Sequence, residues 1–165
     1  MLRGWILGIS CALSLSLALH AETGAEGWLR YASLTESAAS AYRGVPLQAS
    51  SITHAARSER AAAELQKGLS SMLGASGDGV GESRWLLGSA KDLKAAAGWK
   101  SPNKLGEECF SVARGKGNNW LIAGGTDRGE LYGVFYVLEQ IGEQKPLQET
   151  TQCPSAPIRW VNQWD

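Results

Sequence analysis

The residues that could carry chemistry are few, and they form no catalytic set. His54 is the only histidine beyond residue 21, and no serine, cysteine or acid groups with it into a nucleophilic triad. We interpret it as a polar surface residue. Glu107 and Glu108 lie in a predicted strand, where neighbouring side chains point to opposite faces and cannot flank one substrate bond. The sequence therefore predicts no catalytic residue.

Two glycine-rich segments could cradle a phosphate, and neither has the required context. Residues 74–81 follow a predicted helix and precede a strand, whereas phosphate-binding loops follow a strand and open a helix. Gly124, Gly125 and Gly129 do lie between a strand and a helix. Their spacing is not Gly-x-Gly-x-x-Gly, and Asp127 would repel a phosphate. We interpret the first segment as a linker and the second as a structural turn, and we predict no cofactor.

Cys109 and Cys153 are the two cysteines beyond residue 21, and their spacing matches no zinc motif. We predict no metal site. An oxidising compartment would permit a bridge between the two residues. Because the sequence gives no distance between them, we interpret them as unpaired thiols and leave the bridge as the open alternative.

The first 21 residues predict a secretion signal. Arg3 precedes an apolar run from Trp5 to Leu19, and cleavage is expected after Ala21. The alternative is a membrane anchor, but the run is shorter than the roughly 20 residues that a span requires. We expect a secreted or periplasmic protein with no membrane association after cleavage. The 165 residues include 16 basic and 16 acidic ones, so no basic field exists to bind nucleic acid.

Strands and helices follow one another along the chain. The predicted strands cover 26–34, 47–53, 83–89, 107–114 and 119–123, and the predicted helices cover 55–73 and 127–141. Gly74 stands at the expected end of the first helix. Residues 115–118 predict a hairpin turn. Asp127 and Glu130 have the spacing of a capping box, and the helix they begin is expected to cover the sheet.

Six tryptophans beyond residue 21 could form a sugar-stacking platform or pack in the core. Trp28, Trp85 and Trp120 lie in predicted strands beside aliphatic residues, so we predict core positions for them. Trp160 and Trp164 follow a linker at 154–157 and lie in a strand-like run at the end of the sequence. The sequence therefore looks cut at a domain boundary.

Five short sequence segments, taken in their order along the chain, carry a family resemblance. They are Trp28-Leu-Arg-Tyr31, Leu105 to Phe110, Leu121 to Gly124, Asp127 to Phe135 and Arg159 to Asp165. Together they resemble the N-terminal domain of glycoside hydrolase family 67, the α-glucuronidases, over about residues 25–165. The resemblance implies an α/β fold with a mixed β-sheet and helices packed against it, similar to the domain that precedes the barrel in β-hexosaminidases.

The resemblance also implies what a whole family member does. It releases 4-O-methylglucuronic acid or glucuronic acid from xylo-oligosaccharides by an inverting mechanism, with both carboxylates in a following (β/α)8 barrel. A barrel needs roughly 250 residues, so this chain cannot contain one. We expect the family domain at 25–153, and a linker with the start of the missing barrel at 154–165. The expected partner is that barrel or another chain that supplies it. Only the full enzyme is expected to bind the xylo-oligosaccharide. The chain alone should be inactive.

Asn162 to Asp165 resembles the start of the first barrel strand, where the family usually has Asn-His-Trp-Asp. A tryptophan of this run approaches the substrate in the family, so Trp164 is carried over as the candidate sugar contact. Two positions depart from the family pattern: Gln163 replaces the histidine, and Cys109 replaces a glycine before Phe110.

The rival hypothesis is a free-standing carbohydrate-binding module that uses exposed tryptophan rings. A third hypothesis, a small redox or nucleotide-binding protein, is opposed by the single histidine and the broken glycine motif. As an isolated domain, the chain would expose apolar surface that normally meets the barrel, so we expect aggregation or dimerisation.

Overall fold

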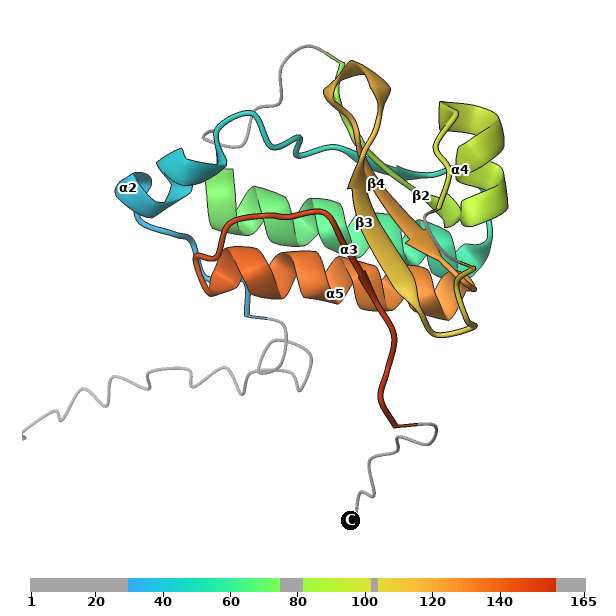
Figure 1. Ribbon diagram of the computed structural model, residues 1–165. Helices are drawn as coiled ribbons and strands as arrows, with labels where there is room; N and C mark the ends of the chain where they lie inside the picture. The colour runs from blue at the N-terminus through green and yellow to red at the C-terminus, as the bar shows by residue number, and fades with distance from the viewer. Residues whose placement is uncertain (1–29, 75–81, 102–103, 157–165) are drawn as a thin grey trace, which may run out of the picture. The chain divides into compact units, whose positions relative to one another are not determined.

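A five-stranded mixed sheet organises the part of the chain that the computed structural model describes, residues 30–74, 82–101 and 104–156 (Figure 1). Its strands are β1 (Ala49–Ser51), β2 (Trp85–Ser89), β3 (Phe110–Arg114), β4 (Trp120–Gly124) and β5 (Thr150–Gln152). Its helices are α2 (Glu36–Ala39), α3 (Ala56–Leu73), α4 (Ala90–Ala97) and α5 (Asp127–Gly142), with short 3-10 turns η1 (Ser40–Tyr42) and η3 (Lys116–Asn118).

The strands lie in the order β1-β2-β4-β3-β5. β1, β2 and β4 are parallel, with Trp85 of β2 opposite Trp120 of β4. β3 runs antiparallel to β4 on one side and to β5 on the other. The parallel strands therefore begin together at Ala49, Trp85 and Trp120. β2 and β4 end together at Ser89 and Gly124, whereas β1 ends opposite Leu87.

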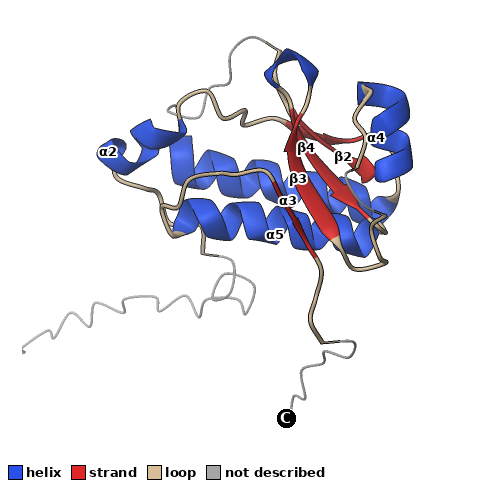
Figure 2. Ribbon diagram, in the orientation of Figure 1, coloured by secondary structure: helices blue, strands red, loops and turns tan. Residues whose placement is uncertain are grey.

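Helices cover both faces of the sheet (Figure 2). Because side chains alternate along a strand, Trp120 and Ile122 of β4 pack against α3 and α5, whereas Leu121 and Ala123 pack against Leu93 of α4. The first cluster is the main core. The predicted α/β architecture, a mixed sheet with helices packed against it, is confirmed.

α3 and α5 lie side by side beneath the sheet, as Figure 1 shows. Their close approach depends on Gly68, where a Cβ would lie 2.5 Å from a methyl carbon of Leu138. α3 ends at Gly74, whose φ of 53° is one that glycine adopts without strain. Helix 55–73, its glycine end and the helix from Asp127 are confirmed within one residue of their predicted bounds.

The strands predicted at 47–53, 83–89 and 119–123 are confirmed, although each is shorter than expected at one end or both. The hairpin is also confirmed, because β3 and β4 pair directly across residues 115–119.

The strand predicted at 26–34 is wrong over the part that the structure describes. Residues 30–34 form no strand. Leu34 donates its backbone N–H to the carbonyl of Met72 at 2.9 Å, and the Ser33 hydroxyl donates to Ser71 at 2.9 Å. The last carbonyls of a helix lack partners within it, so this segment satisfies the end of α3 instead of a sheet.

The chain also contains a helix that the sequence did not predict. α4 begins at Ser89, whose hydroxyl accepts the Asp92 N–H at 3.2 Å, and it ends at Gly98 with a φ of 67°. Only Leu93 of this helix is buried, so no apolar stripe marks it. Ser89 and Asp92, spaced as in a capping box, were the signal that could have revealed it.

The predicted secretion signal at 1–21 and the segment at 157–165 lie outside the described residues, as does the start of the proposed domain at 25. Within the described residues, no helix combines the length and apolar character that a bilayer span requires.

Candidate functional site

His54 lies on the surface, as predicted. Its side chain is 82% exposed, and its Nδ1 lies 3.4 Å from the Glu59 carboxylate. It borders an open hollow of about 520 Å³ between β1 and α3, which is also lined by Ser50, Ser51 and Ser70. Its acid partner lies in the first turn of α3 and is 56% exposed, so the pair lacks the buried orienting acid of a catalytic triad.

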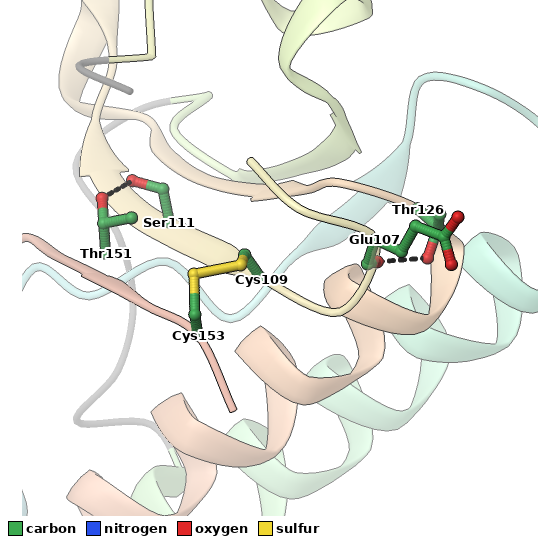
Figure 3. Close-up of a disulfide and its surroundings, with 6 residues drawn as sticks. All are labelled: Glu107, Cys109, Ser111, Thr126, Thr151 and Cys153. Carbon is green, nitrogen blue, oxygen red and sulfur yellow. Dashed lines mark hydrogen bonds between the residues drawn. A yellow bond between two sulfur atoms is a disulfide. The ribbon is translucent and has the colours of Figure 1, made fainter. Parts of the chain in front are cut away.

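Glu107 and Glu108 do not lie in a strand, which corrects the sequence-based placement. β3 begins only at Phe110, and the two acids occupy the turn before it. Glu108 binds Arg128 of α5 at 2.8 Å, and the backbone carbonyl of Glu107 accepts the Thr126 hydroxyl at 2.6 Å (Figure 3). The turn therefore fixes the start of α5 rather than presenting two carboxylates to a substrate.

The turn at Gly124 and Gly125 is structural, as predicted. A Cβ on Gly125 would lie 1.7 Å from the carbonyl oxygen of Gly106, and one on Gly129 would lie 2.4 Å from that of Cys109. The Gly125 N–H donates to the Cys109 carbonyl at 2.9 Å. Close packing of backbone against backbone therefore accounts for glycine at these two positions.

The predicted capping box at Asp127 is wrong. The N-cap of α5 is Thr126, whose hydroxyl is committed to Glu107, and Asp127 is the first helical residue. Asp127 instead binds Arg57 of α3 at 2.6 Å. Glu130 does not reach back to the helix start either, because it is buried with 2% of its surface exposed.

Glu130 is a buried acid whose pKa is shifted. Burial raises its pKa above the ordinary value, and the nearby Asp127 and Asp92 carboxylates raise it further, whereas Ser58 on α3 lowers it. One carboxyl oxygen has no hydrogen-bond partner among the described residues. Glu130 lines none of the four surface hollows that the described residues form, so its carboxyl group reaches no substrate in any of them.

Cys109 and Cys153 form a disulfide, so the interpretation of unpaired thiols is wrong (Figure 3). The cause is the pairing of β3 with β5, in which Phe110 lies opposite Gln152. Continuing that antiparallel register by one residue places Cys109 opposite Cys153, with their Cα atoms 4.2 Å apart. Thr151 supports the same pairing by donating to the Ser111 hydroxyl at 2.9 Å.

Trp85 and Trp120 are core residues, with 0% and 2% of their surfaces exposed. Trp28, Trp160 and Trp164 lie outside the described residues, so the candidate sugar contact at Trp164 stays a prediction. No group of three or more histidines, cysteines or acids that could hold a metal occurs within the described ranges.

A lysine-lined hollow of about 750 Å³ lies at the carboxyl ends of β2 and β4. Ligands of open α/β sheets often bind at this end of the strands. The wall includes Lys91, Lys94, Lys100 and Lys104, four exposed side chains on flexible stems that attract anions without fixing their orientation.

A smaller pocket of about 310 Å³ lies near the other end of the sheet, where β3 ends and β4 begins. Its walls include Arg43, Arg114, Trp120 and Gln144, and we call it the arginine pocket. The Arg114 guanidinium lies over the Trp120 ring, 3.8 Å from the ring centroid. Sequence reasoning missed this site, because residues so far apart in the chain share no motif.

Comparison with known proteins gives one consistent result. A family model described as the glycosyl hydrolase family 67 N-terminus matches residues 27–137. The chain is 33% identical to an alpha-glucuronidase of Hypocrea jecorina, over 93% of this chain and 20% of that protein. It is 34% identical to alpha-glucuronidase A of Emericella nidulans, over 92% of this chain and 19% of that protein.

The probable alpha-glucuronidase A of Neosartorya fischeri is likewise 34% identical, over 88% of this chain and 18% of that protein. The chain therefore spans about a fifth of the length of these curated relatives. The family model covers well over half of the sequence, and its range includes the runs from Trp28 to Phe135. The chain belongs to the glycosyl hydrolase family 67 N-terminal domain family.

Proposed function

We propose that the chain is the non-catalytic N-terminal domain of an α-glucuronidase that releases glucuronic acid or its 4-O-methyl ether from xylo-oligosaccharides. The family match over residues 27–137 is the observation that carries this proposal. The activity in this proposal is taken from the names of the relatives. The chain spans about a fifth of the length of each relative.

The arrangement of acids supports a non-catalytic role. An inverting glycosidase holds two carboxylates about 6.5–9.5 Å apart across the bond that it cleaves. Among the described residues, one carboxylate, that of Glu59, lines the hollow beside His54, and none lines the lysine-lined hollow or the arginine pocket. Two acids near the start of α5, Glu108 and Asp127, form ion pairs with arginines. The catalytic pair is therefore proposed to lie in a separate barrel, the partner of this domain.

A secreted or periplasmic location is part of the same proposal. The apolar run from Trp5 to Leu19 supports it, because such a run behind Arg3 is typical of a secretion signal. The Cys109–Cys153 disulfide supports it independently, because structural disulfides persist in oxidising compartments.

An assay of sugar release tests the proposal. The oxidised chain is incubated with 4-O-methylglucuronoxylo-oligosaccharides, and free uronic acid is measured by chromatography. The proposal predicts no release by this chain and ready release by the Hypocrea jecorina relative assayed in parallel. Turnover by the chain alone, above a heat-denatured sample, would contradict the non-catalytic role.

A further inference from the structure

The arginine pocket is formed by three separate segments of the chain. They are residues 41–45, which include the end of η1, the junction of β3 and β4 at Arg114 and Trp120, and the loop at 144–147 after α5. At about 310 Å³, the pocket is at the small end of the range for ligand sites and matches one small molecule rather than an extended oligosaccharide. We propose that it binds the carboxylate of a single uronic acid residue.

The charge of the pocket favours an anion. Arg43 and Arg114 both line it, and neither forms an ion pair with a carboxylate of the described residues. Among the described residues, no carboxylate lines this pocket. Guanidinium groups bind carboxylates through two parallel hydrogen bonds, and they keep their charge at every pH relevant to the protein.

The indole of Trp120, a residue that lines the pocket, carries an unpaired hydrogen-bond donor. Its Nε1 is buried and has no acceptor among the described residues. Its neighbour Trp85, by contrast, donates its Nε1 to the Pro46 carbonyl at 2.9 Å. Buried donors are nearly always paired, so the unpaired Trp120 donor is unusual. Because the nitrogen itself is buried, it is not a contact for a ligand in the pocket.

The same ring argues against binding of a neutral sugar by stacking. Trp120 already stacks on Trp85, with ring centroids 5.2 Å apart, and it carries the Arg114 guanidinium over its ring. The pocket therefore offers the positive charge of two arginines rather than a free aromatic platform. This arrangement selects for an acidic sugar.

The walls of the pocket are held in place without a ligand. The Tyr42 hydroxyl donates to the Lys145 carbonyl at 2.8 Å and so ties the first segment to the third. Burial raises the pKa of Tyr42, which keeps this hydroxyl protonated and able to donate. The Val45 N–H donates to the Tyr42 carbonyl, and the Lys145 N–H donates to Gln140. A pocket fixed in this way loses little freedom when a ligand binds.

The two parts of the assignment have separate grounds. The choice of a carboxylate rests on the two arginines that line the pocket. The choice of a uronic acid among carboxylates rests on the proposed function, because the relatives are named as alpha-glucuronidases.

Nitrogen-15 NMR on the full, oxidised chain tests the proposal. The indole resonance of Trp120 is assigned with Trp120→Phe, and sodium glucuronate or glucose is added at constant ionic strength. We expect glucuronate to move this resonance in a saturable way and glucose to leave it unchanged. Arg43→Gln and Arg114→Gln should each weaken binding at least about tenfold, because each removes a charge-assisted pair. Arg60→Gln, an exposed change on α3 outside the pocket, should leave the affinity unchanged.

Three results would overturn the proposal. These are an equal response to glucose, an unchanged affinity in both pocket variants, and no response to glucuronate. Inorganic phosphate and acetate serve as further probes, and a response to either of them without one to glucuronate overturns the uronic acid assignment. None of these results changes the outcome expected in the sugar-release assay, so the two proposals fail separately. Circular dichroism of each variant confirms that it is folded before its affinity is compared.

Discussion

Trp85 and Trp120 stack face to face at the start of two neighbouring parallel strands, with ring centroids 5.2 Å apart and ring planes 15° from parallel. The strand register places the two residues directly opposite each other, so the stack is built into the sheet. Both rings are buried against α3 and α5. This pair closes the amino end of the sheet, and one of its members forms a wall of the arginine pocket.

Replacing Trp85 with phenylalanine should destabilise the fold. The variant loses the hydrogen bond to the Pro46 carbonyl and leaves a void beside Trp120. We expect a loss of about 2–4 kcal/mol in the free energy of unfolding, measured by urea denaturation. Trp99→Phe is the matched control, because Trp99 is only half-buried and should cost less. Equal losses at the two positions would contradict a central role for the stack.

The elements that local pattern predicted are those that bury an apolar face. α3 and α5 bury leucines at helical spacing, and β3 and β4 are joined by a short turn. α4 has one buried residue, Leu93, so periodicity could not reveal it. β5 is three polar residues at the sheet edge, and its position depends on pairing with β3 rather than on its own composition.

The site features were harder to predict because they depend on contacts between distant segments. The disulfide follows from the β3–β5 register, which nothing near Cys153 in the sequence specifies. The spacing of Glu130 suited a helix cap, yet the packing of α5 on α3 buries it. Arg43 and Arg114 meet at one pocket only because the turn at 41–45 reaches the end of β3.

Removing the disulfide should lower stability substantially. It closes a loop of 44 residues, for which the chain-entropy relation gives about 4 kcal/mol at 25 °C. Cys153→Ser should therefore shift the urea midpoint well below that of the oxidised chain. Dithiothreitol should produce a similar shift in the unmodified chain and none in the variant. If the oxidised chain and the variant unfolded at the same urea concentration, the bridge would have no stabilising role.

Gly125→Ala should disrupt the turn before α5. The added methyl group would lie 1.7 Å from the Gly106 carbonyl oxygen, so backbone must move to admit it. We expect a loss of several kcal/mol, about 3 or more, or failure to fold. Gly142→Ala is the matched control, because its nearest contact is Met72 at 3.9 Å and a helical alanine is preferred over glycine. Thermal melting of both variants compares them, and similar melting temperatures would argue against the close approach.

The buried carboxyl of Glu130 should make the free energy of unfolding decrease as the pH rises. Its pKa in the folded chain is raised above the ordinary value of 4.5 by burial, so the folded state holds this proton more tightly than the unfolded state. Stability is then highest below the unfolded value and decreases as the pH rises through the folded pKa. Glu130→Gln should remove that decrease and be more stable than the unmodified chain at pH 8.

Urea denaturation of both chains between pH 4 and pH 8 measures this difference. Glu149→Gln, a change at an exposed acid, provides the control and should leave the pH dependence unchanged. Parallel pH profiles for the unmodified chain and Glu130→Gln would show that the buried carboxyl does not titrate as the structure implies.

A domain replacement tests most directly whether this chain is the N-terminal domain of an α-glucuronidase. The matching fifth of the Hypocrea jecorina alpha-glucuronidase is exchanged for residues 25–153 of this chain, and release of 4-O-methylglucuronic acid is measured. The account predicts that the chimera is active and that the same relative without this region is inactive or unfolded. Full activity of the shortened relative, or a folded chimera with no activity, would contradict the account.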